Sequence, residues 1–327
     1  MKPTKVKAWP ELTDYLPGLP ALRETRMEGG AGRAPVDVDF GSVRAVSSTG
    51  LTMFLLRLLR LLGDRNAAGI KMDCAPEIRQ KLEELGAVQL LGAMAGNIQP
   101  ELGLAGAGSR PAPTHAEPHF SLPVYRLSFE PGADRRKVVN RFLPWLATQL
   151  EPLENVFVFE SNGLVMLLNE IAKNAADHAA TDAMFGFDVM PLTQNTSRLT
   201  FAFGDLGIGI KRHIEEHLPP EVKSRQPHMS LYEAYRLAIK PGYSSNPDAT
   251  LNKGHGMSII ITCAIDLSLH LSVFDASSRG LLNSLERLDQ PTHSGLRRIF
   301  HHVGREVGFC YYGEGTITRK PHENQRP

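Results

Sequence analysis

The stretch from Leu164 to Ala179 constrains the fold of this chain more than any other. Its leucine, isoleucine and alanine residues recur at helical spacing and predict a single apolar stripe. Glu170, Asn174 and Asp177 fall about one turn apart on a neighbouring face, so we expect their side chains to converge. A carboxamide oxygen can ligate Mg²⁺, and a carboxylate can orient a water molecule or a hydroxyl group. The alternative is an amphipathic helix whose polar face is only solvated.

The composition is that of an ordinary globular protein, with 42% hydrophobic and 22% charged residues in a chain of 327. This length allows about two domains of ~150 residues each. A formal net charge of +1 provides no basic field, so we expect no nucleic acid partner. The three cysteines are far apart, which predicts no disulfide framework and a cytoplasmic location. No apolar run reaches the ~18 residues that span a bilayer, so we expect no membrane partner.

Residues 35–95 have a strand–helix–strand–helix pattern, which predicts a small α/β domain. Serine and threonine hydroxyls can cap the first helix, and Pro76 begins the second. Residues 1–34 are expected to form an N-terminal extension with at most one short helix. The expected elements are strands at Val36–Phe40 and Ile70–Cys74 and helices at Leu51–Leu62 and Glu77–Leu85.

Two segments of this unit, Ser47–Leu51 and Ala75–Gly86, resemble the STAS domain of bacterial anti-sigma-factor antagonists. In that family a serine or threonine in an Asp-Ser-Ser-Gly-Leu pattern at a helix N-terminus accepts a phosphoryl group. The resemblance implies Ser48 as a candidate phosphoacceptor, and a helix N-terminus favours the new anion. Ser47 stands here where the family has aspartate, and Ser48 and Thr49 are also preferred helix caps. A capping role for these residues therefore remains the alternative.

Residues 96–119 are rich in Gly, Ala and Pro, which predicts a linker. A second α/β domain is expected at 120–320, followed by a tail at 321–327. The order of its elements indicates a mixed sheet covered by helices on one face. The expected strands are Phe120–Phe129, Met184–Met190, Arg198–Phe203, Leu267–Phe274 and Gly313–Arg319, and the expected helices are Ala133–Leu150, Leu164–Ala179, Leu231–Ile239 and Gly256–Ile265.

Three polar motifs follow one another in this second domain. The first pairs Glu170 with Asn174, the second is Asp205–Gly209 at the end of a predicted strand, and the third is Gly254–Gly256 at the start of a predicted helix. The aspartate can accept a hydrogen bond from the exocyclic amine of a base, and the glycine two positions later leaves room for a flat ring. Glycines before a helix expose backbone N–H groups that, together with the helix dipole, favour phosphate.

In this order, the motifs resemble those of the GHKL ATPases, which include histidine kinases, anti-sigma-factor kinases and gyrase-type topoisomerases. Asn169–Ala179 matches the N box, Asp205–Ile210 the first glycine box and Asn252–Met257 the second, with an ATP lid at about Lys211–Lys253. The resemblance implies the GHKL (Bergerat) α/β sandwich and the cofactors ATP and Mg²⁺. It also implies Glu170 as the catalytic base, with the nucleotide bound by Asn174 (as the Mg²⁺ ligand), Asp205 (as the adenine reader), Asp177, Gly207, Gly209, Lys253, Gly254, His255 and Gly256.

Within this family, the chain is most similar to the anti-sigma-factor kinases. The helix predicted before the N box carries no histidine for phosphorylation, and a STAS-like unit is present in the same chain. The resemblance implies a bacterial signalling regulator that hydrolyses ATP or phosphorylates a serine or threonine of a STAS-type or sigma-factor-type partner. The alternative is an ATP-gated interaction switch in which turnover only resets the state. Whether the acceptor is water or a protein serine stays open, and a homodimer is a candidate assembly.

Overall fold

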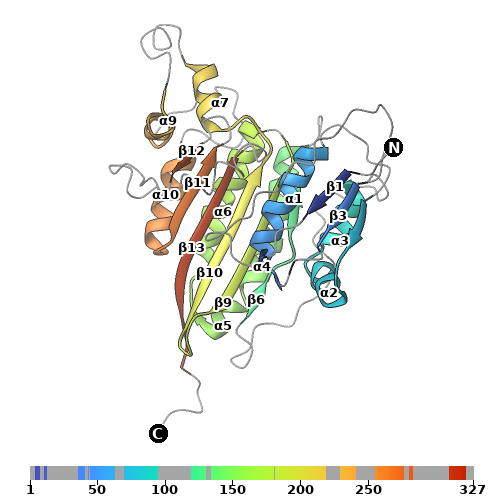
Figure 1. Cartoon of the computed structure of the whole chain (residues 1–327). Helices are drawn as coiled ribbons and strands as arrows, with labels where there is room; N and C mark the ends of the chain where they lie inside the picture. Colours follow the sequence, from blue (N-terminus) through green and yellow to red (C-terminus); the bar gives the residue numbers. More distant parts are fainter. Residues whose placement is uncertain are drawn as a thin grey trace.

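The protein is a mixed α/β structure built around an antiparallel sheet of eight strands (Figure 1). The computed structural model describes residues 4–7, 11–12, 36–40, 43, 45–62, 70–94, 119–129, 134–179, 181–218, 229–240, 255–275, 280–282 and 309–321. Among the helices in these ranges, none combines the length and the apolarity needed to cross a membrane.

The strands of the large sheet lie in the order β12-β11-β13-β10-β9-β6, with β7 also beside β9 and β8 beside β13. Every strand pair described in this sheet is antiparallel, so the prediction of a mixed sheet is wrong. The strands are β6 (Phe120–Ser121), β7 (Tyr125–Leu127), β8 (Phe157–Val158), β9 (Ala183–Pro191), β10 (Thr196–Asp205), β11 (His270–Asp275), β12 (Gly280–Leu282) and β13 (Phe309–Arg319).

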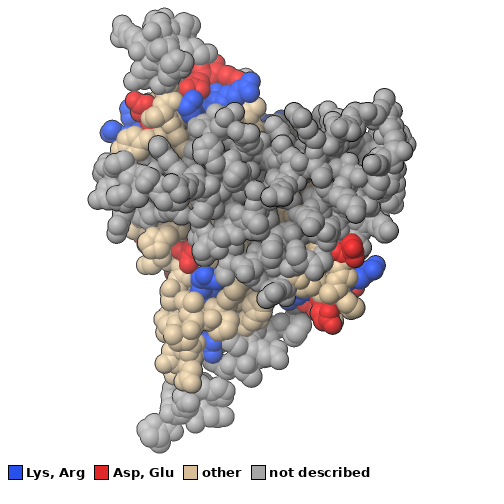
Figure 2. Space-filling model, in the orientation of Figure 1, with Lys and Arg blue, Asp and Glu red and all other residues tan. Residues whose placement is uncertain are grey.

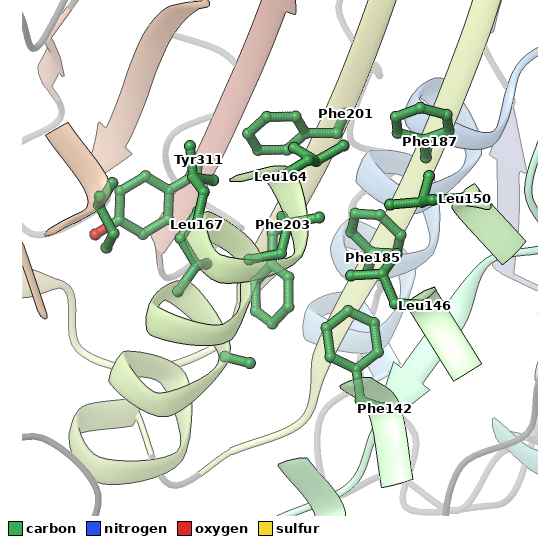
Figure 3. Close-up of a cluster of buried hydrophobic side chains, with 14 of the residues drawn as sticks. Phe142, Leu146, Leu150, Leu164, Leu167, Phe185, Phe187, Phe201, Phe203 and Tyr311 are labelled. Carbon is green, nitrogen blue, oxygen red and sulfur yellow. The ribbon is translucent and has the colours of Figure 1, made fainter. Parts of the chain in front are cut away.

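The first face of this sheet is covered by helices α4 (Arg135–Leu150), α6 (Ser161–Asn174) and α10 (Gly256–Asp266). Because successive side chains of a strand point to opposite faces, every second residue of the central strands faces these helices. Figure 3 shows the resulting aromatic cluster, in which rings from β9 and β10 meet leucines from α4 and α6. Burial of this cluster stabilises the packing of the helices on the sheet. Its central members are Phe142, Leu146, Leu164, Leu167, Phe185, Phe201 and Phe203.

The second face of the sheet is covered by helix α1 (Ser48–Leu62), which packs across β9 and β10 (Figure 1). The intervening strand residues, such as Met184, Ala202 and Tyr312, share one core with the apolar side of α1. The prediction of helices on one face only is therefore wrong. The sheet is buried on both sides, and the structure has a helix layer on each.

The N-terminal part forms a smaller α/β unit around α1. Its parallel sheet has the order β1-β3-β5, and a separate pair joins β2 to β4. The predicted strand–helix–strand–helix order is present, but strands β1 and β2 lie where at most one short helix was expected. The bounds are β1 (Thr4–Lys7), β2 (Glu11–Leu12), β3 (Val36–Asp39), β4 (Ala45–Val46), β5 (Ile70–Asp73), α2 (Pro76–Glu84) and α3 (Ala87–Met94).

Three of the remaining described elements lie near the end of the sheet where β10 finishes: the π-helical turn η1 (Ala175–Ala179) that continues α6, α7 (Ile210–His217) and α9 (Leu231–Ala238). Helix α5 (Leu153–Val156) lies at the opposite end of the sheet, next to β8 (Figure 1). Helix α7 lies at the start of the segment that the GHKL resemblance implies as an ATP lid, and no helix was expected there. Its charged residues form ion pairs one turn apart, Lys211 with Glu215 and Arg212 with Glu216. Figure 2 shows charges of both signs side by side on the described surface, over α7 and over α2.

We predict that Gly186→Ala destabilises the protein by about 1–3 kcal/mol, because a β-carbon there would overlap helix α1. It would lie 2.3 Å from the Thr52 hydroxyl oxygen and 2.4 Å from the Ser48 carbonyl oxygen, and the latter belongs to the helix backbone. The measurement is the free energy of unfolding in denaturant. Gly163→Ala is the control, since its β-carbon would meet only the flexible Leu267 side chain. Equal effects of the two substitutions would show that α1 does not hold this position.

Candidate functional site

The three predicted motifs come together at one end of the first face. Asn174, at the end of α6, lies 3.8 Å from the Met257 sulfur in the first turn of α10, measured from its amide nitrogen. A β-carbon built on Gly207 would lie 2.8 Å from the Cα of Ala179, so the first glycine motif contacts the end of the N box. Segments far apart in the sequence therefore form one site, and the solvated-helix alternative does not describe α6.

The polar face of α6 is largely buried. Glu170 is only 7% exposed, and its Oε1 accepts a 2.6 Å ion-pair hydrogen bond from the Nζ of Lys173. The sequence did not assign Lys173 a role, although its position three residues after Glu170 allows this pairing. Asp177 lies in the π-helical turn and is also buried. A buried carboxylate paired with one cation is held in a fixed direction, as a group that orients a nucleophile must be.

The first glycine motif is a turn fixed by the carboxylate of Asp205. This residue ends β10, is buried, and accepts a hydrogen bond of 2.8 Å from the Gly207 N–H. Burial raises the pKa of Asp205 to about 7, the hydrogen bond from Gly207 opposes this rise, and the charge of Asp275 adds to it. Gly209 has a φ of +83°, which a residue with a side chain rarely adopts. Gly207 is therefore required because the chain passes close to Ala179, and Gly209 is required because of its backbone conformation.

Asp275, which the sequence analysis missed, holds the other end of this turn. It ends β11, and its Oδ2 accepts a hydrogen bond of 3.0 Å from the Lys211 N–H in the first turn of α7. A β-carbon on Gly209 would lie 2.5 Å from its Oδ1. Asp205 and Asp275 both pair in register with Phe309 of β13, so they lie in one row of the sheet. In the sequence, this contact with α7 is indicated only by an aspartate at the end of a mainly apolar strand.

Three histidines connect the π-helical turn to α7. The Nδ1 of His178 lies 3.0 Å from the Nε2 of His213, and the ring centroids of His213 and His217 are 4.3 Å apart. Burial lowers the pKa of His178 and lowers that of His213 to about 4, with the neighbouring histidines adding to the effect on His213. These two rings are therefore neutral at pH 7 and share a hydrogen bond. No set of three His, Cys, Asp or Glu side chains in the described ranges has the geometry of a metal site.

The second glycine motif is described only in part. Gly256 begins α10 and is buried, and His255 before it is exposed and makes no side-chain cap. Lys253 and Gly254 lie outside the described residues, as does most of the predicted lid. The first turn of α10 is therefore placed next to Asn174 through Met257, while the roles of Lys253, Gly254 and His255 stay predictions.

Ser48, the candidate phosphoacceptor, lies on the opposite face of the sheet from Glu170. It is fully buried, and its Oγ accepts a hydrogen bond of 3.2 Å from the Phe187 N–H. The Asp188 carboxylate accepts hydrogen bonds from the Ser48 N–H at 2.9 Å, the Thr49 N–H at 2.8 Å and the Thr49 hydroxyl at 2.7 Å. In this conformation α1 is capped by the Asp188 carboxylate and by the Ser47 hydroxyl, which accepts a hydrogen bond of 3.0 Å from the Gly50 N–H. The Ser48 hydroxyl does not cap the helix, and it is separated from the α6 site by the sheet.

Among solved structures, the chain is similar to a mycobacterial sensor histidine kinase, MprB, at 14% sequence identity and a TM-score of 0.28. The match covers 58% of this chain and 99% of the kinase chain. At this TM-score the superposition is too loose to carry an argument about fold or function. No protein-family model and no curated protein matches the sequence.

We predict that acid destabilises the folded chain partly through His213. Because its pKa falls from 6.5 in the unfolded chain to about 4 in the fold, only the unfolded chain takes up this proton between those values. Stability should therefore decrease as pH falls from about 6.5 to about 4, by at most about 3 kcal/mol from this residue. The measurement compares unfolding free energies at pH 7 and pH 5 for the wild type and His213→Gln.

The substitution should reduce the pH dependence, since glutamine does not titrate and can still hydrogen bond to His178. His270→Gln, at an exposed position on β11, is the control and should retain the wild-type dependence. If the unfolding free energy of His213→Gln changed with pH as much as that of the wild type, the assignment of this pH dependence to His213 would be contradicted.

Proposed function

We propose that this chain binds ATP with Mg²⁺ at the end of the first face and either hydrolyses it or transfers its terminal phosphoryl group in a bacterial signalling role. The observation that carries the proposal is the meeting of the three motifs, in which Asn174 approaches the first turn of α10 and Gly207 abuts the end of the N box. The order of these motifs in the sequence is that of the GHKL ATPases, and their contacts supply the site that this resemblance implies.

Asp205 is suited to recognise a base that carries an exocyclic amine. A buried carboxylate is costly unless it accepts hydrogen bonds, and Gly207 supplies one donor to Oδ1. The raised pKa of about 7 means that ionisation is nearly balanced with protonation at neutral pH. An amine donor from the ligand would stabilise the ionised form, so base binding and ionisation of Asp205 would reinforce each other.

Asn174 is the residue here that fits a magnesium ion bound together with phosphates. Its carboxamide carries a neutral oxygen at the end of α6, and Mg²⁺ in nucleotide sites takes few protein ligands and completes its shell with phosphate and water. The N-terminus of α10, whose first turn contains Met257, favours anionic phosphate nearby. The cation would supply charge neutralisation for the phosphates when it is bound.

Glu170 is the proposed catalytic residue. As a general base it would accept a proton from the attacking hydroxyl or water while the nucleophile approaches the terminal phosphorus. Its ion pair with Lys173 fixes one carboxylate oxygen and leaves the other for this role. The acceptor is water or a hydroxyl of a partner, because the Ser48 hydroxyl of the same chain is buried behind the sheet, where it accepts a hydrogen bond from the Phe187 N–H. Transfer to Ser48 would require α1 to leave that face.

The second candidate function is an ATP-gated interaction switch. The observation that favours it is that α7, which begins the predicted lid, starts directly after the Asp205–Gly209 turn and is tied to it by Asp275. A nucleotide that ordered this turn would also set the direction of α7. Steady ATP hydrolysis without any phosphorylated protein would favour this function over the kinase.

We predict that Asp205→Ala weakens ATP binding by about 10- to 100-fold, the effect of losing a charged hydrogen-bond partner. Wild-type affinity should also fall as pH drops below about 7, because the protonated carboxyl no longer accepts the amine bond. Asp205→Asn should bind with a flatter pH profile. The measurement is equilibrium titration with labelled ATP, with the exposed Asp266→Ala on α10 as control. Equal affinity of wild type and Asp205→Ala would remove the nucleotide assignment.

We predict that Glu170→Gln lowers turnover by about 10²- to 10⁴-fold and leaves ATP affinity nearly unchanged, since a general base acts mainly in the transition state. The measurement is phosphate release from γ-labelled ATP, together with mass spectrometry of the chain and of added STAS-domain proteins. Glu151→Gln, which follows α4 at an exposed position, is the control. Full activity in Glu170→Gln would exclude this residue as the base, and label on a partner serine would identify a kinase.

A further inference from the structure

We infer that Tyr311 is a positioning residue that turns the carboxamide of Asn174 so that its oxygen faces the bound cation. This inference rests on the proposed function, because it concerns the same Mg²⁺ and ATP site. Tyr311 lies on strand β13, outside the three polar motifs of the sequence. Tyr311 does not itself contact the nucleotide in this account and acts through Asn174.

The position of Tyr311 directs its hydroxyl toward the site. The residue lies on β13 and is 1% exposed, with its ring in the core of the first face. Figure 3 shows the ring at the edge of the aromatic cluster, with its oxygen pointing away from the phenylalanine rings. The hydroxyl donates a hydrogen bond of 3.0 Å to the sulfur of Met257, in the first turn of α10.

The side chain of Asn174 is engaged by the same two residues. Its Nδ2 donates to the Met257 sulfur at 3.8 Å. Burial raises the pKa of Tyr311 above its usual value, and a hydrogen bond with the Asn174 side chain opposes this rise. The contact with sulfur uses the NH₂ group of Asn174 as the donor.

A carboxamide whose NH₂ group is held in this way has its oxygen on the other side. Tyr311 and Asn174 both donate to the Met257 sulfur, so the three side chains form one set of contacts. The set favours one of the two amide orientations, the one that presents Oδ1 as a ligand. Partners behind a metal ligand commonly change metal affinity about 10- to 100-fold when they are removed.

Met257 also links helix α10 to these contacts of Tyr311 and Asn174. Met257 lies one residue after Gly256, so its contacts with Tyr311 and Asn174 also locate the start of α10 relative to the end of α6. The cation ligand and the helix end proposed for the phosphates would therefore be positioned together. The role needs a tyrosine hydroxyl in particular, because phenylalanine would fill the core equally well.

The chain offers a matched control in the next residue. Tyr312 lies on the same strand, but its side chain faces α1 on the second face, and its hydroxyl donates to Oε2 of Glu314 at 3.3 Å. Tyr312→Phe removes one buried hydroxyl from β13, as Tyr311→Phe does, without affecting Asn174. A difference between the two variants therefore reports on the site and not on the general effect of losing a hydroxyl.

The test is the affinity for ATP, measured by equilibrium titration of the full chain in excess Mg²⁺ and again in excess chelator. The ratio of the two affinities gives the gain from the cation. We expect Tyr311→Phe to reduce this gain about 10-fold, with unchanged affinity in chelator, and Tyr312→Phe to retain the wild-type gain. Met257→Leu, which removes the sulfur acceptor at similar volume, should reduce the gain in the same direction by a smaller factor.

Each outcome decides the inference. A wild-type gain in folded Tyr311→Phe would overturn it while leaving the proposed function intact, since ATP would still bind. Absence of ATP binding in the folded wild type would overturn the proposed function and this inference with it. If Tyr311→Phe does not fold, which its circular dichroism spectrum would reveal, the result for Met257→Leu decides.

Discussion

The carboxylate of Asp188 is the interaction on which the three-layer arrangement depends. It is fully buried in the middle of β9, where an unpaired charge would be very costly. Two backbone N–H groups and one hydroxyl from the first turn of α1 bind it, and the positive end of the helix dipole adds to this stabilisation. Since these partners are about 140 positions apart in the sequence, the N-terminal part packs directly on the sheet.

Small residues next to Asp188 determine how closely α1 can approach. Gly186 and Ala202 are paired across β9 and β10, and because both are small, α1 can pack close to the sheet at this point. With α1 on this face, the sheet is covered on both sides, and the three polar motifs meet at the end of the first face. Ser47 and Asp188 cap the start of α1 in this conformation. A phosphoryl acceptor would lie in a partner, in solvent, or on an α1 that has left the sheet.

The elements predicted from the sequence are those in which apolar residues recur at regular spacing. The features that were missed depend on partners far away in the sequence. Leu164–Ala179 was identifiable because its apolar residues repeat every three to four positions, and the helix is confirmed apart from its π-helical end. The strand that contains Asp188 was predicted, but helices were expected on one face of the sheet only, because nothing local reveals that α1 covers the other face. Helix α7 was missed because its sequence is mostly charged. Asp275 and Tyr311 act through contacts with segments far away in the chain, and no spacing rule identifies them.

The row that contains Asp205 and Asp275 places two buried carboxylates at one turn. Both carboxylates are buried, both hold backbone N–H groups of the same turn, and the charge of Asp275 disfavours ionisation of Asp205. The other titratable groups that interact with this pair, the hydroxyls of Tyr235 and Tyr311 and the thiol of Cys310, have raised pKa values and are neutral at pH 7. A proton on Asp205 reduces the repulsion between the two carboxylates. A ligand that brings a donor to this carboxylate replaces that proton, so the same pair of aspartates that shapes the turn also favours a ligand with an amine at this position.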